Sequence, residues 1–290
     1  MFTIGIVADS HDWHTRKLRI HLNQNNCNVK KINFDELILK ISGKKFELFQ
    51  RDKKLKLSAV WVRYIGHGTL EQITTKLTIL HLLEAQGIYI HNSPNVIEKT
   101  VDKVRTSGIL GINKISSPKT LIWNQLNLHY PKLSKTKNYL IKPIFGSQGK
   151  NIFLIKDKIK LKILNPDGNI FYIQEFVGDI NSKNFHDFRV IISNHKVVSA
   201  MKRTSKQLVT NVHQGAKFEK INVSTKLKKI CTKVSKIFRL GYAGIDLIEF
   251  KKEFFILEIN SIPSWKAIQK VEESKNITKI LVEDFLRKVR

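Results

Sequence analysis

The segment Ala243–Pro263 reads AGIDLIEFKKEFFILEINSIP. Apolar residues dominate both halves of it, and the polar group Lys251-Lys252-Glu253 separates the halves. Short runs rich in Ile, Leu and Phe on either side of a polar turn are typical of a hairpin. We therefore predict that Ala243–Glu249 and Phe254–Ile259 pair as antiparallel strands.

Three side chains of this hairpin could hold a metal ion, namely Asp246, Glu258 and Asn260. Glu258 and Asn260 are two residues apart, so both point to one face of their strand. Carboxylate and amide oxygens are hard ligands that suit Mg²⁺. Acidic residues on strands are also common at exposed edges. Here, however, they stand among Ile and Leu, where an acidic group costs free energy unless it is coordinated or hydrogen-bonded. Both interpretations stay open at this point.

Upstream, Lys142-Pro143-Ile144-Phe145-Gly146-Ser147-Gln148-Gly149-Lys150 lies between two expected strands. Glycines let backbone amides approach an anion closely, so a strand, a glycine-rich turn and a second strand can cover the phosphates of a nucleotide. The alternative is an ordinary glycine hairpin, because two glycines three residues apart are common. The stretch is not a Walker loop, since no Gly-Lys-Ser/Thr precedes a helix.

Basic and amide side chains form a third group, His186-Asp187-Phe188-Arg189 with Lys202-Arg203 and Asn211-Val212-His213. Such side chains can bind phosphate or a substrate carboxylate through charge-assisted hydrogen bonds. Surface charge on a β-hairpin explains them equally well. Among the remaining histidines, His14 is a weak candidate for substrate contact.

The order of apolar patterns predicts an α+β protein whose N-terminal part alternates strand and helix. That rhythm implies a parallel sheet covered by helices. A single helix is expected over Asn95–Leu110, and others over Thr225–Phe238 and Thr278–Val289. Short strands are expected at Leu140–Lys142, Ile152–Ile155, Ile170–Gln174 and Arg189–Ile192, with a hairpin turn at Ser193–Lys196.

Composition narrows the function classes. The two cysteines, Cys27 and Cys231, lie far apart, which suits a reducing, cytoplasmic setting. No stretch approaches the roughly 20 apolar residues that span a bilayer. The formal charge of +27 comes from basic residues spread along the chain. Compositional bias with acidic substrates explains that charge better than a nucleic-acid surface, although a basic nucleic-acid-binding protein with a vestigial nucleotide site is the rival interpretation.

The motifs occur in an order that resembles the RimK-like ATP-grasp ligases. The order is Asp102-Lys103, Lys142-Pro143 with its glycine-rich loop, Gln174-Glu175-Phe176, Asp187-Phe188-Arg189, and then Asp246, Glu258 and Asn260. The similarity spans essentially the whole chain. His91-Asn92-Ser93-Pro94 and Ile262–Ala267 look most like the branch that adds glutamate to tetrahydromethanopterin.

The resemblance implies an ATP-grasp fold with three domains. They are an N-terminal α/β, Rossmann-like pre-ATP-grasp domain (1–95), a central lid domain (96–177) and a C-terminal domain with the metal site (178–290).

It also implies a role for each matching residue. Lys103 and Lys142 would contact ATP phosphates, and the loop of Gly146, Ser147, Gln148 and Gly149 would close over them. Gln174, Glu175, Phe176 and Val177 would form the hinge that holds adenine and ribose. Asp187 and Asn211 would lie around the nucleotide, Arg189 and Arg203 would act in catalysis, and Asp246, Glu258 and Asn260 would hold Mg²⁺ or Mn²⁺. Val209 and Gln214 stand where relatives have arginine.

The implied function is an ATP-dependent carboxylate–amine ligase that forms an amide bond through an acyl-phosphate. Its substrates would be an amino acid, L-glutamate above all, and a carboxylate-bearing acceptor that is a cofactor or a protein. A ligase for another amino acid or peptide is the nearer alternative. The family also suggests a homo-oligomer.

Overall fold

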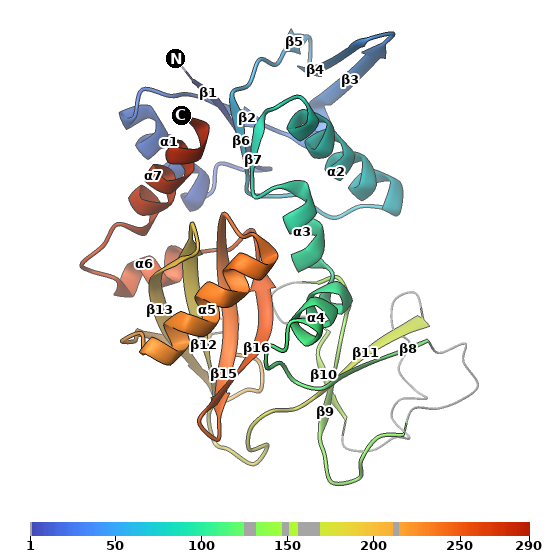
Figure 1. Ribbon diagram of the computed structural model, residues 1–290, viewed down its shortest axis with the longest axis vertical. Coiled ribbons are helices and arrows are strands. Elements are labelled where there is room, and N and C mark those ends of the chain that lie inside the picture. The colour runs from blue at the N-terminus through green and yellow to red at the C-terminus, as the bar shows by residue number, and fades with distance from the viewer. Residues whose placement is uncertain (1, 125–131, 147–150, 156–168, 211–214) are drawn as a thin grey trace.

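The computed structural model describes residues 2–124, 132–146, 151–155, 169–210 and 215–290 (Figure 1). Within them the strands form four separate sheets. We call them the N-terminal sheet, the small β3–β5 sheet, the lid sheet (after the predicted lid domain) and the C-terminal sheet. Figure 1 shows the N-terminal sheet at one end, the lid sheet at the other, and the C-terminal sheet between them. The α+β prediction is therefore confirmed.

The N-terminal sheet is parallel and has the strand order β2-β1-β6-β7. Its strands are β1 (Thr3–Val7), β2 (Asn28–Ile32), β6 (Ala59–Val62) and β7 (Tyr89–His91). Helix α1 (Trp13–Gln24) packs with α7 (Ile277–Val289) on one face, and α2 (Leu70–Ala85) covers the other (Figure 1). Because successive crossovers lie on opposite faces, the strand order reverses between β1 and β6.

A second, small antiparallel sheet follows β2, and the sequence patterns did not predict it. It contains β3 (Leu37–Ser42), β4 (Lys45–Gln50) and β5 (Lys53–Lys54), after the short helix η1 (Phe34–Glu36). The sheet packs its apolar side chains against the same core as α2.

The single helix expected over Asn95–Leu110 is wrong, because two helices occupy this stretch. They are α3 (Pro94–Val101) and α4 (Lys103–Ile112). Asp102 separates them in an extended conformation, and its carboxylate accepts hydrogen bonds from the amides of Val104 and Arg105. A short acidic side chain that caps the next helix competes with continuation of the previous one.

The lid sheet has the order β10-β9-β11-β8 and pairs throughout in antiparallel fashion. Its strands are β8 (Thr120–Asn124), β9 (Tyr139–Lys142), β10 (Phe153–Ile155) and β11 (Ile170–Glu175). Its core contains Trp123, Ile141, Phe171 and Ile173.

The C-terminal sheet has the order β14-β13-β12-β15-β16. Its strands are β12 (Phe185–Ser193), β13 (Lys196–Ser205), β14 (Lys217–Lys220), β15 (Tyr242–Phe250) and β16 (Glu253–Asn260). Both expected hairpins are present, with Ser193 opposite Lys196 and Phe250 opposite Glu253.

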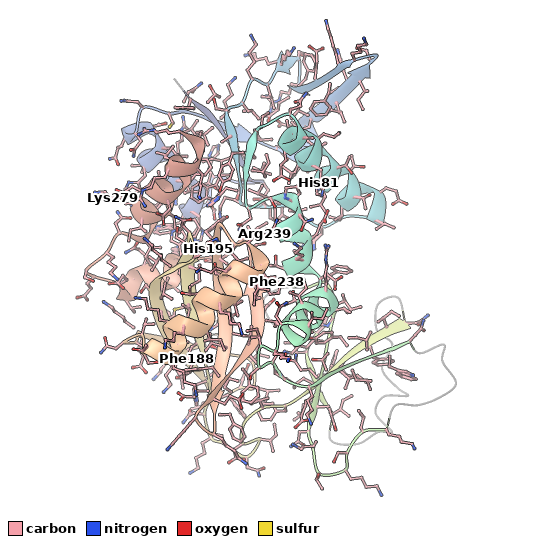
Figure 2. All side chains as sticks on the ribbon, in the orientation of Figure 1. His81, Phe188, His195, Phe238, Arg239 and Lys279 are labelled. Carbon is pink, nitrogen blue, oxygen red and sulfur yellow. The ribbon has the colours of Figure 1, made fainter. Side chains whose placement is uncertain are left out.

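Helix α5 (Thr225–Phe238) is present as predicted, and its apolar side chains belong to the core that lies on one face of this sheet. Figure 2 shows Phe238, at the end of this helix, and Phe188 of the sheet well apart. The short helix α6 (Lys266–Val271) and α7 complete the chain. They cover part of the opposite sheet face together with the N-terminal sheet. No helix among the described residues is long and apolar enough to cross a bilayer. The domain boundaries at residues 95 and 177 stay a prediction.

Asn92 joins the N-terminal sheet to the C-terminal one. Its Nδ2 donates to the carbonyls of Tyr242 (2.7 Å) and Ser261 (2.8 Å), and its Oδ1 accepts from the amides of Gly241 (2.6 Å) and Tyr242 (3.4 Å). The side chain is buried, so each of these backbone groups would lose its partner if the amide were removed.

We therefore expect Asn92→Ala to lower the free energy of unfolding by about 3 kcal/mol, because buried unpartnered polar groups cost roughly 1–3 kcal/mol each. Urea unfolding followed by tryptophan fluorescence would measure this loss. Asn113→Ala is the matched control, since the Asn113 side chain donates to Ile109 at an exposed helix end. Equal stability of the two variants would contradict the role assigned to Asn92.

Candidate active site

The register of β15 and β16 brings the predicted metal ligands together. Asp246 lies directly opposite Glu258, and Asn260 lies opposite Gly244. A register shift leaves Leu257 as an extra residue, a β-bulge on β16. Before the bulge Phe254 and Ile256 face the core, and after it Ile259 does. The bulge therefore turns Glu258 and Asn260 to the face that carries Asp246.

Three further charges lie beside this set, on the neighbouring strands β12 and β13. Arg203 forms a bidentate pair with Asp187, with Nε 2.7 Å from Oδ1. Arg189 forms a second bidentate pair with Asp246, with distances of 2.7 and 2.6 Å. Arg203 also reaches Asp246, with Nη2 3.1 Å from Oδ2. Each arginine is thus paired with at least one carboxylate, and we call Asp187, Arg203, Arg189, Asp246 and Glu258 the charged row.

The charged row is largely buried. Asp187, Arg203 and Asp246 expose only 6%, 4% and 5% of their surfaces. Burial alone would raise the pKa of the Asp246 carboxyl, but Arg189 and Arg203 outweigh burial and hold that pKa below its usual value. Asp246 is therefore ionised wherever the protein is folded at neutral pH.

Two lysines from the lid side face the row. Lys142 ends β9, and Lys103 begins α4. Burial lowers the pKa of Lys142 to about 8, with Lys103 adding to the effect and the charge of Glu258 opposing it. Burial likewise lowers the pKa of Lys103. The Lys103 ammonium donates to the carbonyls of Ile144 (3.3 Å) and Gly146 (3.1 Å) at the start of the glycine-rich loop.

The side chain of Gln174 positions Lys142. Its Oε1 accepts from Lys142 Nζ at 2.6 Å, and its Nε2 donates to the hydroxyls of Thr120 (3.2 Å) and Tyr172 (3.0 Å). Tyr172 in turn bonds Ser107 of α4 at 2.7 Å. The sequence analysis missed Thr120, Tyr172 and Ser107. The available signal was the two-residue spacing of Tyr172 and Gln174, which places them on one face of β11.

The remaining hinge residues follow Gln174 along the chain. Glu175 forms an ion pair with Lys137 (2.6 Å). The amides of Glu175 and Phe176 donate to the carbonyls of Lys119 and Asn138, both at 2.8 Å. Val177 is half-buried, and its amide donates to no backbone carbonyl within the described residues. The predicted residues Ser147, Gln148, Gly149, Asn211 and Gln214 lie outside the described residues.

The prediction that His14 contacts substrate is wrong, because both of its ring nitrogens serve the fold. Nδ1 lies 2.9 Å from the Asp12 carboxylate. Nε2 lies 3.1 Å from Ser264 Oγ and the Trp265 amide, and 3.2 Å from the Lys266 amide. Burial lowers the pKa of His14, so the neutral ring ties the start of α1 to the loop before α6.

A divalent cation fits the donor set at the end of the row. Glu258 and Asn260 are half-buried, and their side-chain oxygens accept no hydrogen bond within the described part of the chain. A carboxylate and an amide left without donors beside an ionised Asp246 provide hard oxygens for Mg²⁺. Among the described residues no three His, Cys, Asp or Glu side chains are placed together to hold a metal ion, and Asn260 is the side chain of this face that could add a third oxygen.

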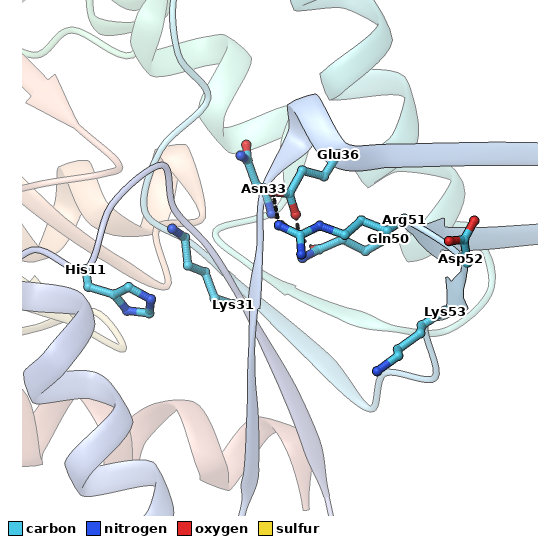
Figure 3. Close-up of a pocket in the computed structure, with 8 residues that line it drawn as sticks. All are labelled: His11, Lys31, Asn33, Glu36, Gln50, Arg51, Asp52 and Lys53. Carbon is cyan, nitrogen blue, oxygen red and sulfur yellow. Dashed lines mark hydrogen bonds and ion pairs between the residues drawn. The ribbon is translucent and has the colours of Figure 1, made fainter.

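A cavity of about 480 Å³ lies elsewhere, between the end of β2 and the small β3–β5 sheet (Figure 3). Polar and charged side chains line it: His11, Lys31, Asn33, Glu36, Gln50, Arg51, Asp52 and Lys53. None of the predicted site residues is among them. Glu36 pairs with Arg51 and Gln50 at its rim. The charged row, whose ion pairs are buried, is the stronger candidate for chemistry.

Carboxylates and guanidinium groups of one sheet lie beside Lys142 of β9 and Lys103 of α4, an arrangement that suits a polyphosphate with its cation. The RimK-like ATP-grasp domain family matches residues 100–284. This chain belongs to that family, and it is accordingly a ligase.

Individual relatives are similar in sequence over nearly the whole chain, beyond the matched residues 100–284. The tetrahydromethanopterin:alpha-L-glutamate ligase of Methanococcus maripaludis is 32% identical over 98% of this chain and 97% of its own length. The coenzyme gamma-F420-2:alpha-L-glutamate ligase of the same organism is 25% identical over 98% and 99%. Among solved structures, the ATP-grasp ligase PsnB in complex with a phosphomimetic variant of its minimal precursor, Mg and ADP superposes with a TM-score of 0.74. It has 15% identity and covers 100% of this chain and 99% of that one. The predicted ATP-grasp fold and ligase class are thus confirmed.

Proposed function

We propose that this ligase uses Mg·ATP to join the amino group of L-glutamate to a carboxylate of a cofactor acceptor. The observation that carries the proposal is the charged row facing Lys142 and Lys103, because it supplies both signs of charge that a metal-bound triphosphate needs. The names of the relatives, which span nearly the whole chain, support glutamate as the amino acid and a pterin or deazaflavin cofactor as the acceptor.

The chemistry asks mainly for positioning and charge. An acceptor carboxylate attacks the γ-phosphate of ATP, ADP leaves, and the acyl-phosphate that forms is attacked by the amine of glutamate to give an amide and phosphate. Lys142 and Arg203 offset the negative charge on the transferring group. Lys103 ties Ile144 and Gly146, at the start of the glycine-rich loop, to α4.

We assign the remaining roles in the same way. Asp246, Glu258 and Asn260 would hold Mg²⁺, which would neutralise phosphate charge when bound. Arg189 holds the Asp246 carboxylate in place. The backbone around Val177 would bind the adenine, because its amide is free of other backbone partners whereas those of Glu175 and Phe176 are used.

The direct test measures ADP release with Mg·ATP while L-glutamate and other amino acids are scanned against pterin, deazaflavin and acidic-peptide acceptors, with product masses recorded. We expect turnover that requires L-glutamate and one cofactor acceptor, with a mass gain of one glutamate residue or more. Turnover that requires a different amino acid would refute the glutamate assignment, and no turnover with any pair would refute the proposed acceptor class.

Glu258→Gln tests the metal site without disturbing the fold. Because Glu258 has no hydrogen-bond partner among the described residues, an amide of the same shape should leave thermal stability unchanged. We expect turnover to fall at least 100-fold, with a partial recovery at high Mg²⁺. Glu249→Gln, an exposed carboxylate of β15, is the matched control. A Glu258→Gln enzyme with near-normal turnover would remove the metal assignment.

Lys142 makes nucleotide binding depend on pH. Its pKa of about 8 means that free Lys142 is charged below pH 8 and loses its proton as the pH rises through that value. Bound phosphates favour the charged form, so Mg·ATP binding at pH 8.5 should take up a proton and affinity should fall above pH 8.

Calorimetric titration in buffers of different ionisation enthalpy measures that uptake. We expect it to disappear in Lys142→Met and to persist in Lys236→Met, an exposed lysine of α5. Equal uptake in both variants would show that another group takes the proton.

A further inference from the structure

We propose that Arg63 binds a non-reacting carboxylate of a substrate, at the junction between the N-terminal sheet and the loop that precedes α6. This inference rests on the proposed function, because it concerns how the same active site holds an acidic substrate.

Arg63 has a fixed place at the end of a strand. It directly follows β6, and its amide donates to the Val7 carbonyl at 2.9 Å. It thus lies at the carboxyl ends of β1 and β6, where the strand order of the parallel sheet reverses. Ligands of open α/β sheets bind in the crevice at such a position.

The guanidinium group is held on one edge only. Nη1 donates to the Pro263 carbonyl at 2.7 Å and lies 3.3 Å from the Tyr242 hydroxyl. The group stacks over the Trp265 indole, with 4.7 Å between its carbon and the ring centroid. These contacts fix the plane of the guanidinium, which is what a bidentate site requires.

The other edge has no partner among the described residues. Arg63 forms no ion pair there, Nε is buried without an acceptor, and no hydrogen bond leaves Nη2. The nearby Asp12 carboxylate pairs with His14 instead. A partly buried guanidinium whose Nε and Nη2 have no acceptor costs free energy unless an anion accepts their hydrogen bonds.

The same edge binds carboxylates twice elsewhere in this protein. Arg189 and Arg203 each use Nε and Nη2 to hold Asp246 and Asp187. A carboxylate from a substrate would complete Arg63 in the same geometry.

The position relative to the charged row suits a substrate. A Cβ built on Gly244 would lie 3.1 Å from Pro263 Cβ and 3.7 Å from Arg189 Nε. Pro263, whose carbonyl accepts the hydrogen bond from Arg63, therefore packs on the sheet face that carries Arg189 and Asp246. A substrate with one carboxylate at the row and another at Arg63 would span this short separation.

The carboxylate could belong to the incoming amino acid or to the acceptor, and two probes separate these sources. L-Glutamate stands for the amino acid, and γ-L-glutamyl-L-glutamate stands for an acidic acceptor tail. Binding to the wild type, Arg63→Met and Arg63→Lys is followed by tryptophan fluorescence in the presence of Mg·ADP, since Trp265 contacts the guanidinium. L-Glutamine is the comparison for the loss of one carboxylate, and Arg16→Met is the control for loss of an exposed arginine of the same sheet's helix α1.

We expect Arg63→Met to bind one of the two acidic probes at least 10-fold more weakly, with Arg63→Lys in between and Mg·ADP affinity unchanged within twofold. If Arg63 holds the side-chain carboxylate of the amino acid, L-glutamine should bind the wild type and Arg63→Met alike, and if it holds the α-carboxylate, L-glutamine should lose affinity in Arg63→Met as L-glutamate does. Unchanged binding of both acidic probes in Arg63→Met would overturn the site. So would an equal loss of probes and Mg·ADP together with a lowered melting temperature, because that pattern marks a purely structural residue.

Two further results keep this inference apart from the proposed function. A wild type that turns over with substrates but shows no saturable response to either probe would overturn the Arg63 site and leave the ligase assignment standing. Arg63-dependent binding of a probe, with no turnover for any substrate pair, would support the site and refute the proposed substrates.

Discussion

The candidate active site depends on one electrostatic constraint, which is that the buried Arg203 and the half-buried Arg189 must be neutralised by carboxylates of the same sheet. Arg203 and Arg189 lie between Asp187 and Asp246, each in bidentate contact. Removing one member of such a network would leave an uncompensated buried charge, at a cost of roughly 3–5 kcal/mol. The pairing therefore fixes these side chains in place, and on the proposed function little reorganisation would be left for the reaction itself.

The row carries three carboxylates and two guanidinium groups, so its own charge is negative at the Glu258 end. A triphosphate would be repelled from that end without a cation, whereas Lys142 and Lys103 attract it from the lid side. Metal and nucleotide consequently favour each other's binding. The lowered pKa of Lys142 has the same origin. Burial, with Lys103 nearby, makes the charged ammonium unfavourable, and phosphate oxygens would remove that penalty.

The sequence predicted many of the strands, and it singled out the side chains that the structure brings together in the charged row, but not the contacts that arrange them. Spacing of two put Glu258 and Asn260 on one face, and apolar neighbours indicated that Asp246 needed partners. The bulge at Leu257 is invisible in a run of apolar residues, because every residue from Phe254 to Leu257 could face the core. Arg203 as a partner of both Asp187 and Asp246 depends on strand register, and register is set by the whole sheet. Helix capping by Asp102 explains the break between α3 and α4, whereas the apolar periodicity alone predicted one continuous helix. The small β3–β5 sheet was missed because the apolar residues of β3 (LILKIS) and β4 (KFELFQ) do not alternate strictly with polar ones.

The distance between Arg63 and the charged row also follows from the way the N-terminal sheet is attached to the C-terminal sheet. Asn92 bonds four backbone groups of Gly241, Tyr242 and Ser261, and the neutral ring of His14 binds the backbone before α6. Both attachments hold the segments that lead into and out of the β15–β16 hairpin. The N-terminal sheet thus sits rigidly on the strands that carry Asp246 and Glu258, whereas the lid sheet meets them through lysines and a hydrogen-bond chain. These contacts fix where Arg63 stands relative to the charged row. If Arg63 holds a substrate carboxylate as proposed, a fixed spacing of that kind would favour substrates whose carboxylates match it.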